Sequence, residues 1–356
     1  MWDKVGPRNW RRPLLLRPDN FTPTSRTPWG GRRIRERLKA DAQLQPGGPV
    51  GEAWELSVEP DFPSRLADGP TLDEVLRADP VLLGAEAPSG STSLLVKLVD
   101  AADDLSVQIH PHDDDPQLGA DESGKPEAWY IIDAEPGAGL YLGFRAGVTR
   151  QDVETAIDAQ KDVSALMSFV PVSPGDLFMI GPGTPHAIGK GVLLLEPQRV
   201  SPGKRGVTYR YWDWNRKYDD AGRLDPSGQP RPLHRERALA VTRWEGAADA
   251  VHIDRLSHHA GPARIDGPAT LEVLMSREGP LQSEVFTVRR VAGSGKLQLD
   301  AADRLRSLTV LDGRVTLHDG ETILAMSRGQ TSALPACLGP LQVDLDSAHA
   351  VLCSLT

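Results

Sequence analysis

The chain has 356 residues, and 39% of them are hydrophobic, so it can bury a core as one large domain or two of ordinary size. Asp and Glu number 49 against 40 Lys and Arg, which gives a net charge of −9. This balance argues against nucleic acid or an anionic membrane surface as the main partner, because both need a basic footprint. The two cysteines, Cys337 and Cys353, exclude a disulfide scaffold or a Cys-rich zinc site and suit a reducing compartment. No apolar run approaches the roughly 20 residues that span a bilayer, so we expect a soluble, cytoplasmic protein.

Short apolar runs, separated by Gly and Pro residues scattered along the chain, predict a strand-rich first part. Many of these runs are continuous rather than alternating, which suits strands covered on both faces or strands in a closed barrel. We expect strands at residues 53–58, 93–99, 106–109, 128–132, 139–144, 176–180 and 191–198.

Two stretches are expected to form helices beside this β core. The first covers residues 71–78, where Thr71 is followed by two acidic residues that the helix dipole favours in the first turn. The second covers residues 149–167, with Thr149 as the N-cap and apolar residues at helical spacing.

A polar stretch rich in Gly and Pro, residues 219–237, is expected to carry the chain into a second unit. After about residue 250 the pattern is purely β, with Asp312-Gly313 and Asp319-Gly320 as hairpin signals. We expect strands at residues 286–291, 305–311, 314–318, 322–326 and 350–355. This unit contains His252, His258, His259, His318 and His349, but none lies in a pattern typical of a site, so we expect a structural role.

The chemistry-bearing residues cluster in the first part of the chain. Gln108 and His110 are two apart on an expected strand and therefore point to the same face. Glu127 follows next to an aromatic strand, and His186 comes after a turn that contains Gly and Pro. Two His, one carboxylate and an amide oxygen suit a mononuclear Zn²⁺ site with room for water or substrate. His112 is a possible substitute ligand, although its position before three aspartates favours an acidic loop.

Several segments, in the same order along the chain, resemble the type I mannose-6-phosphate isomerases, also called phosphomannose isomerases. They cover roughly the first 220 residues, and the later β unit resembles the second barrel of that family more loosely. The matching segments are PWGG from Pro28, GEAWELS from Gly51, LLVKLVDAADDLSVQIHPHD from Leu94, GKPEAWY from Gly124, GTPHAIGKGVLLLEPQ from Gly183 and TYRYWDWNR from Thr208.

The resemblance implies a mainly β fold of two cupin-like barrels (double-stranded β-helices, or jelly rolls) with short helical insertions. It places a catalytic cupin domain at residues 1–245 and a C-terminal β-barrel domain at residues 246–356. One zinc ion per chain is expected inside the first barrel. One departure is visible, because the usual Pro-Ala-Gly-Thr before the last histidine reads Gly-Pro-Gly-Thr at residues 181–184. This alters the turn but keeps Gly183 and His186, so we expect the site to be retained.

Carried over position by position, the resemblance places the metal ligands of the family on His110, Glu127 and His186, with Gln108 as the fourth ligand in some members. The catalytic arginine falls on Arg210. Two further positions, Lys125 and Glu196, could move protons, and the sequence does not choose between them. Ser106 and Lys97 match positions near the substrate phosphate, and Trp29 is a candidate for the wall of the sugar pocket.

Each of these residues also has a structural interpretation. Arg210 could be a surface salt-bridge partner of Asp213, and Lys97 could be a strand-end lysine whose amine reaches solvent. Ser106 could be a hydroxyl at a strand edge, whereas Trp29 and Trp54 could be packed in the core.

The predicted function is a zinc-dependent interconversion of mannose 6-phosphate and fructose 6-phosphate through an enediol or enediolate. An isomerase acting on another phosphorylated sugar, or a non-catalytic cupin that binds sugar or metal, is the alternative. The expected partner is a small phosphorylated sugar, with neither nucleic acid nor membrane, and the protein is expected to be a monomer or a weak homo-oligomer.

Overall fold

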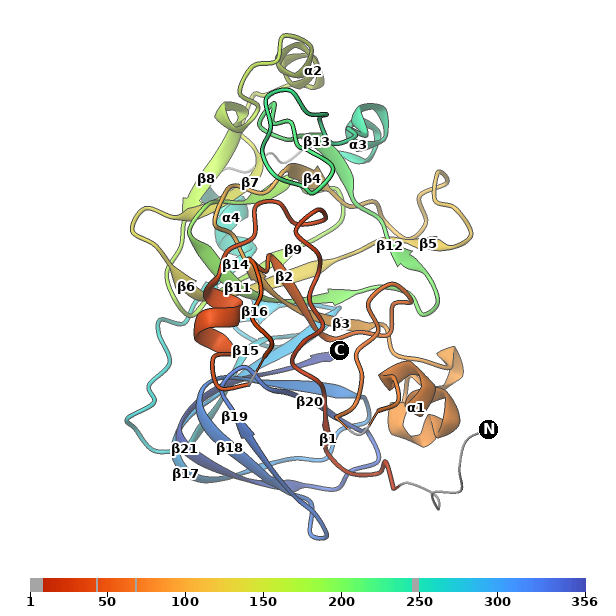
Figure 1. Ribbon diagram of the computed structural model, residues 1–356, viewed down its shortest axis with the longest axis vertical. Helices are drawn as coiled ribbons and strands as arrows, with labels where there is room; N and C mark the ends of the chain where they lie inside the picture. The colour runs from red at the N-terminus through yellow and green to blue at the C-terminus, as the bar shows by residue number, and fades with distance from the viewer. Residues whose placement is uncertain (1–8, 43, 68, 245–249) are drawn as a thin grey trace.

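The computed structural model describes residues 9–42, 44–67, 69–244 and 250–356, which fold into two β-rich units. Figure 1 shows the C-terminal unit in blue below the larger first unit, with α2 and α3 at the opposite end of the molecule. The fold class is mainly β, as predicted. No helix in the described part of the chain is long and apolar enough to cross a membrane.

Two antiparallel sheets form the first unit, and hydrophobic side chains from both of them share one buried cluster. The larger sheet has the order β14-β9-β6-β11-β3-β2, and the smaller has the order β13-β4-β10-β7-β8. The strands of the larger sheet are β2 (Glu52–Leu56), β3 (Leu94–Asp100), β6 (Glu127–Ala134), β9 (Asp176–Ile180), β11 (Val192–Arg199) and β14 (Ser257–His259). The strands of the smaller sheet are β4 (Val107–Ile109), β7 (Gly139–Phe144), β8 (Met167–Pro171), β10 (His186–Ile188) and β13 (Tyr209–Trp212), and a parallel pair is formed by β5 (Glu122–Ser123) and β12 (Arg205–Gly206).

The C-terminal unit is one sheet with the order β1-β20-β18-β21-β17-β15-β16, to which β19 adds beside β18. Its strands are β1 (Leu14–Leu15), β15 (Thr270–Ser276), β16 (Leu281–Gln282), β17 (Phe286–Leu299), β18 (Arg306–His318), β19 (Ile323–Ser327), β20 (Thr331–Leu334) and β21 (Leu341–Leu355). Two strands lie in the sheet of the other unit: β1 pairs with β20, and β14 pairs with β9. The division near residue 245 stays a prediction, and it adjoins residues 245–249, which lie outside the described ones.

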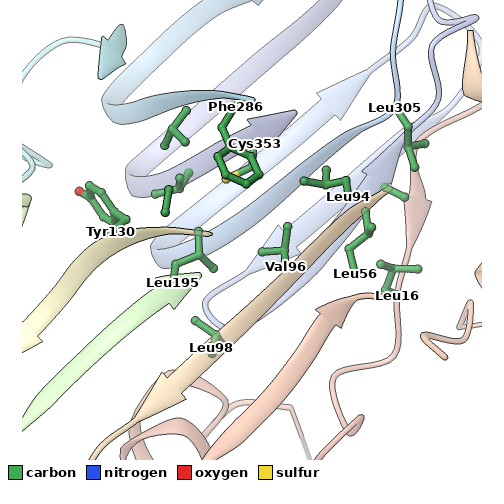
Figure 2. Close-up of a cluster of buried hydrophobic side chains, with 14 of the residues drawn as sticks. Leu16, Leu56, Leu94, Val96, Leu98, Tyr130, Leu195, Phe286, Leu305 and Cys353 are labelled. Carbon is green, nitrogen blue, oxygen red and sulfur yellow. The ribbon is translucent and has the colours of Figure 1, made fainter. Parts of the chain in front are cut away.

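The two units share a hydrophobic core. In Figure 2, Leu94, Val96 and Leu98 of β3 lie in one cluster with Phe286 of β17 and Cys353 of β21. Cys353 is buried there, where a free cysteine packs as a small apolar residue. On the opposite face of β3, Leu95 and Val99 pack in two other hydrophobic clusters and Lys97 lies between them, so both faces of the strand are buried.

The helices are α1 (Leu72–Ala78), α2 (Arg150–Asp158), α3 (Arg235–Val241) and α4 (Ala250–Arg255). The start of α1 is as predicted, since the Glu74 N–H donates to Thr71 Oγ1 and the Thr71 N–H donates to the Glu74 carboxylate. The second predicted helix is too long. The chain leaves α2 after Asp158, Gln160 adopts a left-handed φ of 52°, and β8 already begins at Met167.

Two expectations for the C-terminal unit are wrong. The segment after residue 250 is not purely β, because α4 precedes β14. Asp312-Gly313 is not a hairpin but a bulge inside β18, where the pairing with β21 shifts and Gly313 has a φ of 64°. Both a hairpin turn and a β-bulge need a glycine that permits a left-handed backbone, so an Asp-Gly pair alone does not distinguish between them. Asp319-Gly320 does form the hairpin between β18 and β19.

Candidate metal and substrate site

Three buried side chains from different strands converge in the first unit. His110 directly follows β4, Glu127 opens β6 and His186 opens β10. Their relative exposures are 1%, 1% and 0%, and one ligand atom from each lies within 4.8 Å of the others. Strand pairing brings the two histidines together although they lie far apart in the sequence, since β10 pairs directly with β4.

The hydrogen bonds of the two histidines fix which ring nitrogen faces the centre. His110 Nδ1 lies 2.9 Å from the Val207 carbonyl oxygen, and His186 Nδ1 lies 2.8 Å from the Thr184 carbonyl oxygen. A carbonyl oxygen can only accept, so each Nδ1 carries the hydrogen and each Nε2 presents a lone pair. The Nε2 atoms of His110 and His186 lie 3.1 and 3.8 Å from the Glu127 carboxylate oxygens.

The donor set fits a divalent metal ion. Within the described residues, the two Nε2 atoms and Glu127 Oε2 are buried without a hydrogen-bond partner, which is unusual for polar atoms in a folded protein. Burial, and then the neighbouring His110, lowers the pKa of His186 to about 3, so its ring is neutral. Burial alone would raise the pKa of Glu127, but His110 and Lys125 hold it well below its usual range. Neutral imidazoles, oriented by carbonyl groups, and an ionised carboxylate are ligands that zinc prefers.

The other candidate ligands are placed differently. Gln108 is the cross-strand neighbour of His186 on one side and of Arg210 on the other, and it lines the cavity beside the cluster that is described below. His112 stays outside the cluster, because its side chain is 61% exposed and lies 3.2 Å from Asp114 Oδ1. The turn before His186, where the sequence departs from the usual pattern, connects the two histidine segments, because the Gly183 N–H donates to the His110 carbonyl oxygen.

Gln198 is a site residue that the sequence analysis missed. It lies on β11 directly opposite Glu127, is 1% exposed, and donates from Nε2 to Glu127 Oε1 over 2.5 Å. Its position two residues after Glu196, on the same face of the same strand, was the available signal. Gln198 therefore orients the carboxylate of the candidate metal centre.

A cavity of about 290 Å³, here called the site cavity, opens beside this centre. It brings together side chains from both sheets of the first unit and from the loops between them. The predicted residues that line it are Trp29, Lys97, Ser106, Gln108, Lys125, Glu127, Glu196 and Arg210. Glu52, Trp54 and Thr208 also line it.

Lys97 and Glu196 form one wall of the site cavity. They are cross-strand neighbours on β3 and β11, and Lys97 is 5% exposed in the middle of its strand, so the interpretation as a strand-end lysine is wrong. The Lys97 amine lies 4.2 Å from the centre of the Trp54 ring and 3.9 Å from Glu52 Oε2. Trp129 Nε1 donates to Glu196 Oε1 over 2.8 Å. Burial, with the charge of Glu127 added, raises the pKa of Glu196 to about 8.

Lys125 is held in a different way. Its amine lies 3.1 Å from Glu127 Oε1 and donates to Thr208 Oγ1 over 3.1 Å. Burial by itself lowers the pKa of Lys125, but the carboxylates of Glu127 and Glu196 outweigh burial, so the pKa is raised. Lys125 is therefore a fixed cation beside the candidate metal ligands.

Arg210 closes the opposite side of the cavity from β13. Its Nε donates to Ser106 Oγ over 3.2 Å, and its Nη1 donates to the Pro232 carbonyl oxygen over 2.9 Å. The interpretation of Arg210 as a partner of Asp213 is wrong, because the Asp213 carboxylate is held by Arg216 and Arg231. Burial, followed by the charge of Arg231, lowers the pKa of Arg210 to about 10, which leaves it cationic at neutral pH.

Known proteins resemble this chain in sequence and in fold. Residues 22–135 match the family model described as phosphomannose isomerase type I, catalytic domain. A probable mannose-6-phosphate isomerase of Bacillus subtilis, GmuF, is 33% identical over 322 residues, which cover 89% of this chain and 92% of that protein. The chain belongs to the type I phosphomannose isomerase family.

A further relative and two solved structures are also similar to this chain. The mannose-6-phosphate isomerase of Streptococcus mutans is also 33% identical, over 89% of this chain and 92% of its own. The crystal structure of a mannose 6-phosphate isomerase from Bacillus subtilis superposes with a TM-score of 0.74 at 26% identity, over 96% of this chain and 99% of that one. A mannose 6-phosphate isomerase structure bound with zinc and yttrium shares the fold, with a TM-score of 0.65 at 14% identity over 96% of this chain and 98% of that one.

Proposed function

We propose that this phosphomannose isomerase interconverts mannose 6-phosphate and fructose 6-phosphate with one zinc ion per chain. The observation that carries the proposal is the buried His110–Glu127–His186 set, in which both Nε2 atoms and Glu127 Oε2 have no hydrogen-bond partner among the described residues. Glu127 also lines the cavity together with Glu196 and Arg210. The names of the relatives in the family support the choice of substrate.

The zinc ion would be held by His110, Glu127 and His186, with Gln108 as the fourth ligand. When bound, it supplies a positive charge that polarises the substrate oxygens. Gln198 and the two carbonyl groups that accept from the histidines keep the ligand atoms directed at one point. The Lys125 amine lies beside Glu127 Oε1 and balances the charge of that carboxylate.

Aldose–ketose isomerisation moves a proton between C1 and C2, so it needs a group that exchanges a proton near neutral pH. Glu196 fits this role better than Lys125. Glu196 faces the cavity. Within the described residues Trp129 is its one hydrogen-bond donor, to Oε1, which leaves the second carboxylate oxygen for substrate. Lys125 is occupied by Glu127 and Thr208 and stays protonated.

Arg210 is proposed to stabilise the negative charge that develops on the enediolate oxygens. Its planar guanidinium is oriented by Ser106 and the Pro232 carbonyl group and faces the same cavity as Glu196. Lys97 and the Ser106 hydroxyl are proposed to bind the substrate phosphate, and Trp29, which is 5% exposed, to form part of the wall.

The test is a coupled assay for fructose 6-phosphate formation from mannose 6-phosphate, before chelation, after chelation and after zinc is returned. We expect about one zinc per chain, loss of activity on chelation and recovery with zinc. His110→Ala and His186→Ala should lose both metal and activity, whereas His112→Ala, an exposed histidine outside the cluster, should keep both.

The same assay separates the alternatives. Turnover of a different phosphorylated sugar without turnover of mannose 6-phosphate would contradict the substrate assignment. Zinc binding without turnover of any sugar phosphate would identify a non-catalytic binding protein. Full metal occupancy in the protein that carries both His110→Ala and His186→Ala would contradict the ligand assignment.

A further inference from the structure

A second cavity, of about 610 Å³, lies in the C-terminal unit and shares no lining residue with the site cavity. We call it the arginine cavity, because Arg277, Arg289, Arg304 and Arg306 line it. Nothing in the proposed isomerase chemistry uses these residues.

Adjacent strands β17, β21 and β18 form the floor of the arginine cavity. Thr287 pairs with Ser354, and Ser354 pairs with Arg306, so these three side chains form one row across the sheet. Arg289 lies two residues after Thr287 on β17 and therefore points to the same face. It is paired with Leu352, which belongs to the next row. The floor thus presents two guanidinium groups and two hydroxyl groups together.

The wall of the cavity is fixed by contacts with the first unit. The Ala85 N–H donates to the Asp303 carbonyl oxygen over 2.7 Å, and Gly84 forms a β-bridge with Arg304. Arg306 Nη1 donates to the Asp300 carbonyl oxygen over 2.9 Å. These bonds hold the 300–304 segment over the sheet, so the cavity is built into the fold.

Arg289 and Arg306 keep unfilled hydrogen-bond capacity, although Asp300 and Asp303 also line the cavity. Arg306 is 3% exposed, and within the described residues its Nε and Nη2 atoms have no hydrogen-bond acceptor, as is also true of Arg289 Nε. Arg277 and Arg304 instead have carboxylate neighbours, at 3.0 Å in Glu284 and at 3.9 Å in Asp303. Burial, and then the charge of Arg289, lowers the pKa of Arg306, and the charge of Asp300 only partly offsets this. Two neighbouring cations, one of them buried, are unfavourable unless an anion joins them.

We propose that the arginine cavity binds a small phosphomonoester, with its phosphoryl group held between Arg289 and Arg306 and next to Thr287 and Ser354. Paired guanidinium groups match the oxygens of a phosphoryl group, and hydroxyl groups add neutral donors. The volume lies within the range of small-molecule sites, so the cavity has room for the organic part of the ligand as well as for the anion. This proposal does not depend on the isomerase function.

Equilibrium dialysis of the full-length, zinc-loaded protein tests this site, with labelled glycerol 3-phosphate as the phosphomonoester and inorganic phosphate as the bare anion. The variants are Arg306→Gln and Arg289→Gln. The matched control is Arg314→Gln, which removes the same charge from an exposed position farther along β18, outside the cavity. Circular dichroism and the melting temperature establish that each variant folds.

The wild-type protein and Arg314→Gln are expected to bind one more equivalent of glycerol 3-phosphate per chain than Arg306→Gln and Arg289→Gln. At least a 10-fold loss of affinity is expected at this site in Arg289→Gln. Because Arg289 is only half-buried, this variant supplies the test if Arg306→Gln does not fold. A folded Arg289→Gln variant with wild-type binding would overturn the proposal. Binding of inorganic phosphate without binding of glycerol 3-phosphate would overturn the assignment to a phosphomonoester.

Discussion

A hydrogen bond between Tyr130 and His349 links the two units and makes the stability of the protein depend on pH. The Tyr130 hydroxyl lies 2.9 Å from His349 Nε2, and these residues come from β6 in the first unit and β21 in the C-terminal unit. Tyr130 lies three residues after Glu127 on the same strand. Burial, and then the charge of the nearby Arg290, lowers the pKa of His349 to about 4. The folded protein therefore holds this histidine neutral, as an acceptor for the tyrosine hydroxyl.

The direction of the effect follows from the two pKa values of His349, about 4 when folded and about 6.5 when unfolded. Between these values the unfolded chain binds a proton that the folded chain does not, so stability falls as the pH decreases from about 7. At about 1.4 kcal/mol per pKa unit, the loss attributable to His349 is about 2 kcal/mol at pH 5 and approaches about 3.5 kcal/mol well below pH 4.

Urea unfolding of the metal-free wild type and of His349→Gln between pH 7.5 and 4.5 measures this contribution. Glutamine keeps an acceptor for Tyr130 but cannot titrate, so subtracting the two free energies of unfolding removes the effect of all other groups. The wild type is expected to lose about 2 kcal/mol more than His349→Gln from pH 7.5 to pH 5, whereas the exposed-histidine control His112→Gln should follow the wild type. A difference that stays constant within about 0.5 kcal/mol would refute the explanation.

Three further predictions concern the site and its surroundings. Arg210→Ala should lower kcat and kcat/KM together by roughly 10²–10³-fold, and Arg210→Lys should recover part of this loss, whereas Lys97→Ala should mainly raise KM. If steady-state kinetics of Arg210→Ala show a raised KM at unchanged kcat, Arg210 is a substrate anchor instead. Gln198→Leu removes the donor to Glu127 and should weaken zinc affinity by roughly 10–100-fold in competition with a chelator, and unchanged affinity would contradict its positioning role. His318→Ala should leave turnover and zinc content unchanged, because His318 contacts Asp344 on the C-terminal sheet; loss of turnover with zinc retained would show that this unit takes part in the chemistry.

The strands of the first unit could be predicted because their apolar runs are bounded by turn residues, and the predicted strand at 176–180 coincides with β9. The C-terminal unit was harder to predict, since Asp-Gly marks a hairpin in one place and a bulge in another. The end of α2 was also missed. The apolar periodicity continues past Asp158, and only the left-handed backbone at Gln160 breaks the helix.

At the site, residue types and their spacing can be read from the sequence, but the contacts between the residues cannot. Gln108 and His110 could be placed on one face from their spacing alone. The bonds from Nδ1 to carbonyl oxygens, which leave both Nε2 atoms free for a metal, depend on backbone groups far along the chain, as with Val207 for His110. Gln198 was overlooked for the same reason: its role comes from lying opposite Glu127 across a strand pair, and a single strand does not reveal its partner.

Strands β3 and β11 contribute to the site and also join the two units, because successive side chains along each strand point to opposite faces. On β3, Lys97 faces the site cavity while Val96 and Leu98 belong to the core shared with the C-terminal sheet. On β11, Leu195 enters that core and Glu196 faces the cavity. A polar cavity on one face of a sheet leaves the apolar opposite face in need of cover. The C-terminal unit supplies that cover, so it stabilises the strands that position Lys97 and Glu196, while none of its described residues lines the site cavity.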